Sequence, residues 1–119
     1  MSKHKAAQNC NILPWVTEKT DGKEGRFLLV GNSLLLSKVF QSLSVGARQL
    51  YLCMALESGG KRNFEFPLAS AKKYGIPQTS FRRYVDELIE AKFILRFSNA
   101  NLRQPNQYEF TSAWKPDNK

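Results

Sequence analysis

The segment 67–114 constrains the fold of this chain more than any other part of the sequence. It begins with a short helical pattern that stops at Gly75, where glycine can adopt the left-handed backbone of a tight turn. A longer amphipathic pattern opens at Gln78, with apolar residues at helical spacing. Two strand patterns follow at 93–98 and 107–111, joined by a polar loop. The order is therefore helix, sharp turn, helix and hairpin.

Elements upstream extend this pattern. Ser44 is a good N-cap for a helix over 45–57, whose apolar residues form one broad face. The apolar run 26–30 predicts a strand, and 34–40 a short helix. The alternation at 64–66 predicts a half-buried strand that can join the hairpin.

Together these patterns predict an α+β winged helix-turn-helix. It has a three-helix core, a C-terminal β-hairpin wing, and an extra N-terminal strand and short helix. We expect this single domain to span residues 26–119. Residues 1–25 are expected to form a flexible basic leader, because they are polar and interrupted by Pro14, Gly22 and Gly25.

The charge balance points to a polyanionic partner. The chain has 18 Lys and Arg residues against 10 Asp and Glu, a net charge of +8. Between positions 61 and 83 the only acid is Glu65, whereas Asp86, Glu87 and Glu90 follow near the end of the long helix. A basic front with an acidic rear favours oriented docking on nucleic acid over diffuse attraction.

The long helix of the motif offers the candidate reading residues. A recognition helix presents its N-terminal turns to base edges in the major groove of DNA. Gln pairs with adenine and Arg with guanine, while Thr and Ser contact bases or phosphates. The residues concerned are Gln78, Thr79, Ser80, Arg82 and Arg83. Asp86 and Glu90 would repel phosphates, which limits entry to the first two turns.

Other basic residues are candidates for phosphate contacts that position the protein without reading sequence. Lys72 and Lys73 lie on the first helix of the motif, and Lys61 and Arg62 could flank the same surface. On the hairpin, Arg96 lies on the first strand. Arg103 and Gln104 lie in the loop, where a side chain can reach the minor groove. Each of these has a plainer interpretation as part of a solvated surface.

Nothing in the sequence favours an enzyme. His4 is the only histidine, and with Cys10 and Cys53 it lacks the spacing of metal ligands. No phosphate-binding glycine loop occurs, so we expect no metal, no cofactor and no small-molecule ligand. Two cysteines do not make a disulfide framework, and no apolar stretch is long enough to span a membrane. These features favour a cytoplasmic protein.

From Gly25 onward the chain resembles the winged-helix domain of plasmid and mobile-element replication initiators and related phage or transposon proteins. The resemblance rests on RFLLVGNSLLLSKVFQSLSVGARQLYLCMALES, FEFPLASAKKYGIPQTSFRRYVDELIEAKFI and PNQYEFTSAW. It implies sequence-specific, double-stranded DNA binding in replication or transcription control of a transposon, plasmid or phage. A homodimer or partner protein would supply further contacts. The alternative is a winged-helix adaptor for protein–protein contact in a replication, conjugation or packaging complex, which would expose an apolar patch on this surface.

Overall fold

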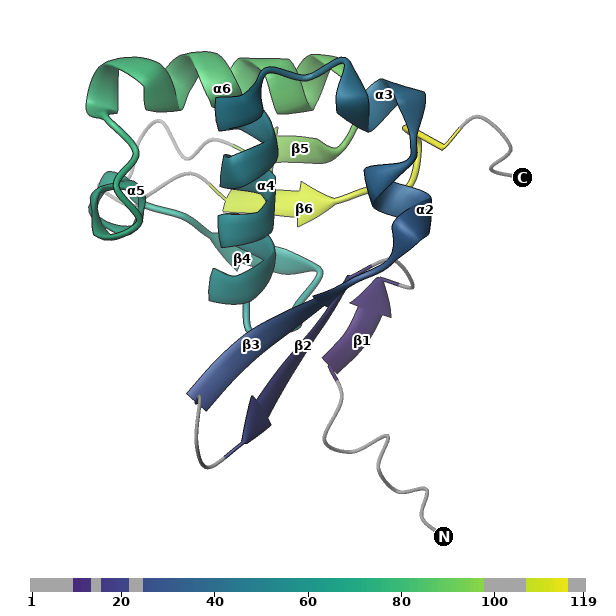
Figure 1. Ribbon diagram of the computed structural model, residues 1–119. Coiled ribbons are helices and arrows are strands. Elements are labelled where there is room, and N and C mark those ends of the chain that lie inside the picture. Colours follow the sequence, from purple (N-terminus) through teal and green to yellow (C-terminus); the bar gives the residue numbers. More distant parts are fainter. Residues whose placement is uncertain (1–9, 14–15, 22–24, 98–106, 116–119) are drawn as a thin grey trace, which may run out of the picture.

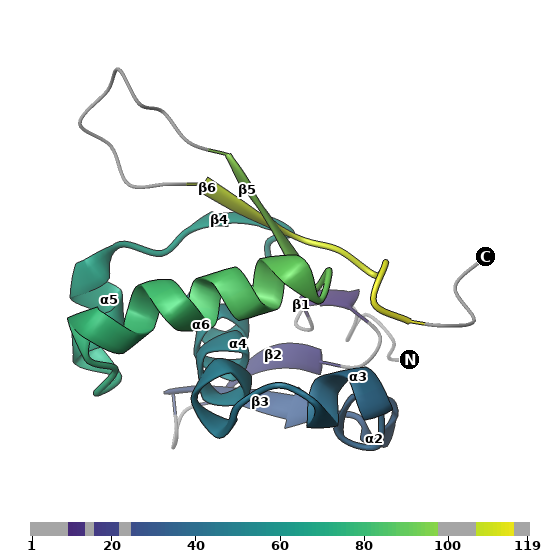
Figure 2. The same cartoon turned by 90° about the horizontal axis from the view of Figure 1, so that it is seen from above.

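The computed structural model describes residues 10–13, 16–21, 25–97 and 107–115. Within them the fold is α+β, with five helices and two three-stranded antiparallel sheets. Figures 1 and 2 show α4 crossing α6 at a steep angle, with one sheet behind α6 and the other below. The α+β class expected from the sequence is therefore confirmed.

The N-terminal sheet consists of β1 (Cys10–Leu13), β2 (Val16–Asp21) and β3 (Gly25–Val30), in that order. β3 confirms the strand expected from the apolar run 26–30. The two strands before it lie within residues 1–25, for which the sequence predicted a flexible basic leader and no strand. Their sequence is mostly polar and gave no strand pattern. β2 pairs antiparallel with β3 along its whole length, from Val16 opposite Val30 to Asp21 opposite Gly25, and β1 pairs antiparallel with β2.

Two short helices replace the single one expected over 34–40. They are α2 (Asn32–Leu35) and α3 (Lys38–Gln41). Ser37 separates them because its backbone is extended (φ −68°, ψ 130°), and its side chain accepts a hydrogen bond from the Phe40 N–H at 3.4 Å. The sequence interpretation overlooked this second cap.

The helix α4 (Val45–Glu57) begins as predicted at Ser44, whose Oγ accepts a hydrogen bond from the Ala47 N–H at 3.2 Å. It ends before Gly59 and Gly60, both with positive φ. Its buried residues surround most of the helix, so α4 is the centre of the core. Tyr51 packs edge-on against three aromatic rings, those of Phe40, Phe93 and Phe110.

The two helices predicted in this segment are present as α5 (Leu68–Lys73) and α6 (Gln78–Glu90). Gly75 lies between them with φ of +79°, the conformation expected for this turn. Pro67 and Pro77 immediately precede the two helices with extended backbones, and neither gives a side-chain cap. The extended ψ of 167° leaves Pro67 just outside the first turn of α5.

The second sheet, called here the hairpin sheet, contains β4 (Asn63–Glu65), β5 (Ile94–Phe97) and β6 (Gln107–Phe110). The strand order is β4–β6–β5, so the strand expected near 64–66 does join the hairpin. Its inner face carries Phe64, Ile94 and Phe110, which are buried in the core. The sheet thereby fixes the hairpin against α6.

Candidate nucleic-acid interface

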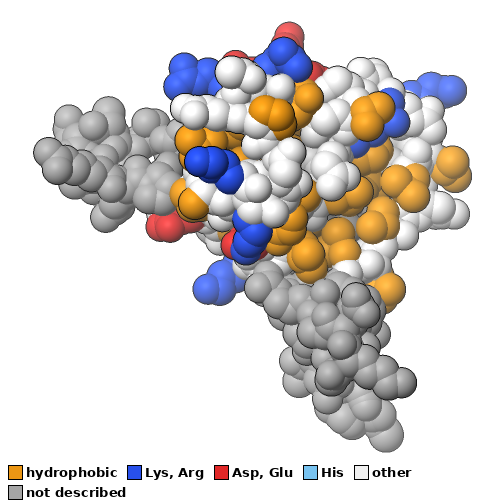
Figure 3. Space-filling view, turned by 60° about the vertical axis from the view of Figure 1, so that its left-hand side comes forward, with side chains coloured by type: hydrophobic (Ala, Val, Ile, Leu, Met, Phe, Trp, Pro, Cys, Tyr) orange, Lys and Arg blue, Asp and Glu red, His pale blue; other side chains and the backbone are white. Residues whose placement is uncertain are grey.

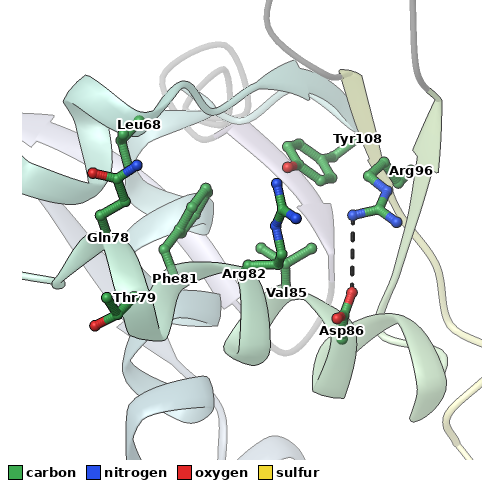
Figure 4. A pocket seen from close by; sticks show the side chains of 9 residues that line it. All are labelled: Leu68, Gln78, Thr79, Phe81, Arg82, Val85, Asp86, Arg96 and Tyr108. Carbon is green, nitrogen blue, oxygen red and sulfur yellow. Dashed lines mark ion pairs between the residues drawn. The ribbon is translucent and has the colours of Figure 1, made fainter. Parts of the chain in front are cut away.

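An open groove of about 840 Å³ separates the first half of α6 from the inner face of the hairpin sheet. Its walls combine exposed polar groups with the edge of the core. The lining residues are Leu68, Gln78, Thr79, Phe81, Arg82, Val85, Asp86, Arg96 and Tyr108. Figure 4 shows the Arg82 and Arg96 side chains extending into the same space from the helix and the strand, with Tyr108 between them.

Helix and strand periodicity explains why these side chains meet. Gln78, Arg82 and Asp86 are four residues apart and therefore lie on one side of α6. The buried Val85, at the floor of the groove, and the buried Leu88 anchor the helix to the core. On the sheet, Arg96 is directly paired with Tyr108 in the antiparallel register, so both face the helix.

The groove contains two arginines and one carboxylate. Arg96 Nη1 lies 3.9 Å from Asp86 Oδ1, and the two side chains are 37% and 62% exposed. Such a long, solvated ion pair contributes little to stability. Arg82 lies one helical turn before Asp86 and makes no ion pair within the described residues. The groove therefore retains a cationic end near the start of α6.

Arg83 does not share this groove, although it is adjacent to Arg82. Successive helical residues are rotated by about 100°, which directs Arg83 away from the hairpin sheet. Its guanidinium lies over the Tyr84 ring at 5.3 Å. Ser80 is half-buried and does not line the groove either. Of the five candidate reading residues, the structure brings together Gln78, Thr79 and Arg82.

The two lysines on α5 differ in their surroundings. Lys73 Nζ donates to Glu57 Oε1 at 3.0 Å, and the same carboxylate oxygen accepts from the Tyr74 hydroxyl at 2.8 Å. Lys72 is exposed, with no ion pair among the described residues. The two lysines were predicted to act alike because Glu57 lies before the basic run 61–83 and was not considered as a partner.

The remaining basic candidates lie elsewhere. Arg62 donates to the Phe110 carbonyl at 3.2 Å, at the end of β6 distant from the hairpin loop. Neither Lys61 nor Arg62 lines the groove. Arg103 and Gln104 fall outside the described residues.

Sequence reasoning missed part of the site. Asp86 was expected only to repel phosphates at the rear of the helix, yet it lines the groove and reaches Arg96. Tyr108 was interpreted as a core or strand residue and was not included in the site. The four-residue spacing from Gln78 to Asp86, combined with the pairing of Arg96 and Tyr108, is the pattern that could have revealed both.

Metal binding and membrane insertion have little support in the described part of the chain. No three His, Cys, Asp or Glu side chains there gather closely enough to hold a metal ion. No helix in the same residues is long and apolar enough to cross a membrane. The groove itself offers guanidinium, amide, hydroxyl and carboxylate groups, which suit hydrogen bonding to a polar, anionic partner.

Large apolar side chains are exposed at several places away from α6. They are Leu29, Leu35, Leu36, Val45, Leu95 and Phe97. On the face shown in Figure 3, hydrophobic side chains gather most densely at the centre and right, whereas Lys and Arg side chains are scattered around the edges on both sides. None of these six residues belongs to α6, so the exposed side of that helix is polar.

Comparison with known proteins gave no match to any family model, any curated protein or any solved structure.

Proposed function

We propose that this protein is a non-enzymatic, sequence-specific binder of double-stranded DNA with a winged helix-turn-helix fold. The observation that carries the proposal is the position of Gln78, Thr79 and Arg82. All three are exposed on one side of α6, within its first two turns and beside the hairpin. A recognition helix presents this part to base edges in the major groove.

The order of elements supports the same proposal. α4, α5 and α6 would be the three core helices, with Gly75 at the sharp turn. β5 and β6 would be the wing, and β4 the third strand of its sheet. In this arrangement Gln78 can pair with adenine and Arg82 with guanine.

Charge supports a phosphate-bearing partner. The net charge is +8, and Lys72 extends the exposed cationic surface onto α5. Phosphate contacts release counterions, so affinity should fall steeply with salt. A single module of this size contacts few base pairs, and useful specificity then requires a homodimer or a partner protein.

The biological role that we propose is replication or transcription control of a mobile genetic element, such as a transposon, plasmid or phage. This part rests on the resemblance of the sequence to initiator-type winged helices. This role would place the protein in the cytoplasm.

Selection of bound duplexes from a random pool tests the proposal. A defined motif should emerge, and binding to it should weaken with salt on a log–log slope of about −5 if roughly six phosphates are contacted. Arg82→Ala should weaken the selected duplex more than a scrambled one, and Lys72→Ala should weaken both alike. Salt-independent binding, or no binding at all, would overturn the proposal.

A second candidate is protein–protein contact, favoured by the exposure of Leu36 (67%) and Val45 (74%). These residues lie outside α6, so this surface differs from the one where the adaptor alternative required an apolar patch. A Leu36→Ser, Val45→Ser double variant should keep its DNA affinity while losing any self-association in sedimentation. If wild type and the double variant sediment alike at every protein concentration, a second copy of this chain is not the partner of this surface.

A further inference from the structure

We propose that Asp86 is a specificity-determining residue, because it withholds Arg96 from the phosphates of non-cognate DNA. The inference rests on the proposed function and assigns a role to the acidic group of the groove. It starts from the ion pair that joins Asp86 of α6 to Arg96 of β5 at 3.9 Å.

The position of Asp86 makes this role possible. Its side chain is 62% exposed, so any DNA strand that enters the groove meets its carboxylate. It is the only acidic residue among those lining the groove, which also holds Arg82 and Arg96. A backbone phosphate approaching Arg96 must therefore lie beside a like charge, whereas one at Arg82 lies a helical turn away from it.

The distribution of charge has a consequence for sequence discrimination. Non-specific binding is almost entirely phosphate attraction, so withdrawing one arginine from it weakens every non-cognate complex. In the proposed cognate complex, the base-edge contacts of Gln78 and Arg82 hold the DNA at the start of α6, a helical turn from Asp86, so that complex does not draw on Arg96. Asp86 thus lowers the background affinity more than the cognate affinity.

The test compares wild type with Asp86→Asn on the selected duplex and on a scrambled duplex of equal length. The substitution keeps the shape of the side chain and removes its charge. Affinity for the scrambled duplex should rise by about threefold to tenfold. The log–log salt slope of that binding should steepen by about one, the equivalent of one more phosphate contact. Affinity for the selected duplex should change by less than about twofold, so the ratio between the two falls.

Two controls separate the inference from a general charge effect. Glu90→Gln removes an exposed acid one turn further along α6, outside the groove. It should leave the ratio unchanged. In an Arg96→Gln background, Asp86→Asn should no longer increase scrambled binding. Melting temperatures equal to wild type would show that each variant is folded.

Three results would overturn the inference. An equal gain for Glu90→Gln would indicate bulk charge alone. A gain that persists without Arg96 would show that the ion pair is not involved. A loss on the selected duplex without any gain on the scrambled one would make Asp86 a base reader instead. If wild type binds neither duplex, the proposed function fails first, and that outcome is distinct from the other three.

Discussion

Glu87 of α6 accepts both hydrogen bonds that Ser44 donates at the start of α4. The Ser44 N–H lies 2.9 Å from Glu87 Oε1, and the Ser44 hydroxyl lies 2.8 Å from Oε2. The same hydroxyl oxygen accepts from the Ala47 N–H. One carboxylate therefore fixes the residue that caps α4, and it joins the start of α4 to α6 across 43 positions of sequence.

Substitutions at this contact should act as a unit. Ser44→Ala should cost about 1 kcal/mol of unfolding free energy through the lost cap, and Glu87→Gln about 1–2 kcal/mol through the lost charge-assisted bonds. The double variant should lose less than the sum of the two. Urea unfolding measures all three, with Glu90→Gln as a matched control expected to stay within about 0.5 kcal/mol of wild type. Additive losses would contradict the coupling.

Gly46 and Tyr84 should show coupling of the opposite kind. A Cβ at Gly46 would collide with the Tyr84 ring, including its Cζ and hydroxyl oxygen. Gly46→Ala should therefore destabilise the protein by about 1–3 kcal/mol, as overpacking does. With Tyr84→Ala in place, the same substitution should stabilise by about 0.5–1 kcal/mol, because alanine favours a helix over glycine. Thermal unfolding of the four proteins tests this change of sign.

Arg82 and Arg83 should differ in DNA binding, although the sequence gives them equal standing. Arg82 lines the groove, and Arg83 lies over the Tyr84 ring instead. Arg82→Ala should cost about 1–3 kcal/mol on a selected duplex and relax preference at one base position. Arg83→Ala should cost less than half as much. If Arg82→Ala lowers the affinity for selected and scrambled duplexes equally, α6 is not the element that recognises the DNA sequence.

Lys72 and Lys73 provide a second unequal pair. Lys73 already has an anionic partner in Glu57, whereas Lys72 has none among the described residues. Lys72→Ala should reduce the salt slope by about one. Lys73→Ala should reduce it less, and Glu57→Gln should increase it by releasing Lys73. Binding titrations over a salt series compare the three, and an equal effect of both lysine variants would rule out this distinction.

Cys53 predicts a pH dependence of stability. Burial raises the pKa of its thiol above the ordinary value of 9.0; a hydrogen bond with Gln49 opposes this, and Glu57 adds to it. The native state therefore holds the proton more tightly than the unfolded chain does. Its contribution is complete below pH 9.0 and is lost as pH rises towards the native pKa. As pH rises above about 9, the unfolding free energy should fall more steeply in wild type than in Cys53→Ala, as urea unfolding at a series of pH values would show.

Local features were predictable from the sequence because local residues determine them. Ser44 as a cap, Gly75 at the turn and the start of α6 after Pro77 all follow from residues a few positions apart. The break at Ser37 was a local feature too. It was missed because the apolar residues on the two sides of Ser37 keep a helical spacing, with Leu36 followed by Val39 and Phe40.

Contacts across elements were not predictable in the same way. The pairs Asp86–Arg96, Glu87–Ser44 and Lys73–Glu57 depend on how helices cross and on strand register. Strand β2 depends on β3 beside it, since its own residues show no apolar alternation. The candidate site was therefore predictable as a helix face, but not as a groove with two walls.

The order β4–β6–β5 also determines when this molecule can fold during synthesis. The central strand of the hairpin sheet is the last of the three to leave the ribosome, so β4 and β5 must wait for it. Until Gln107–Phe110 emerges, Phe64 has neither Tyr108 nor Phe110 to stack on. The nascent chain should therefore keep part of its aromatic core accessible to chaperones until β6 has been made.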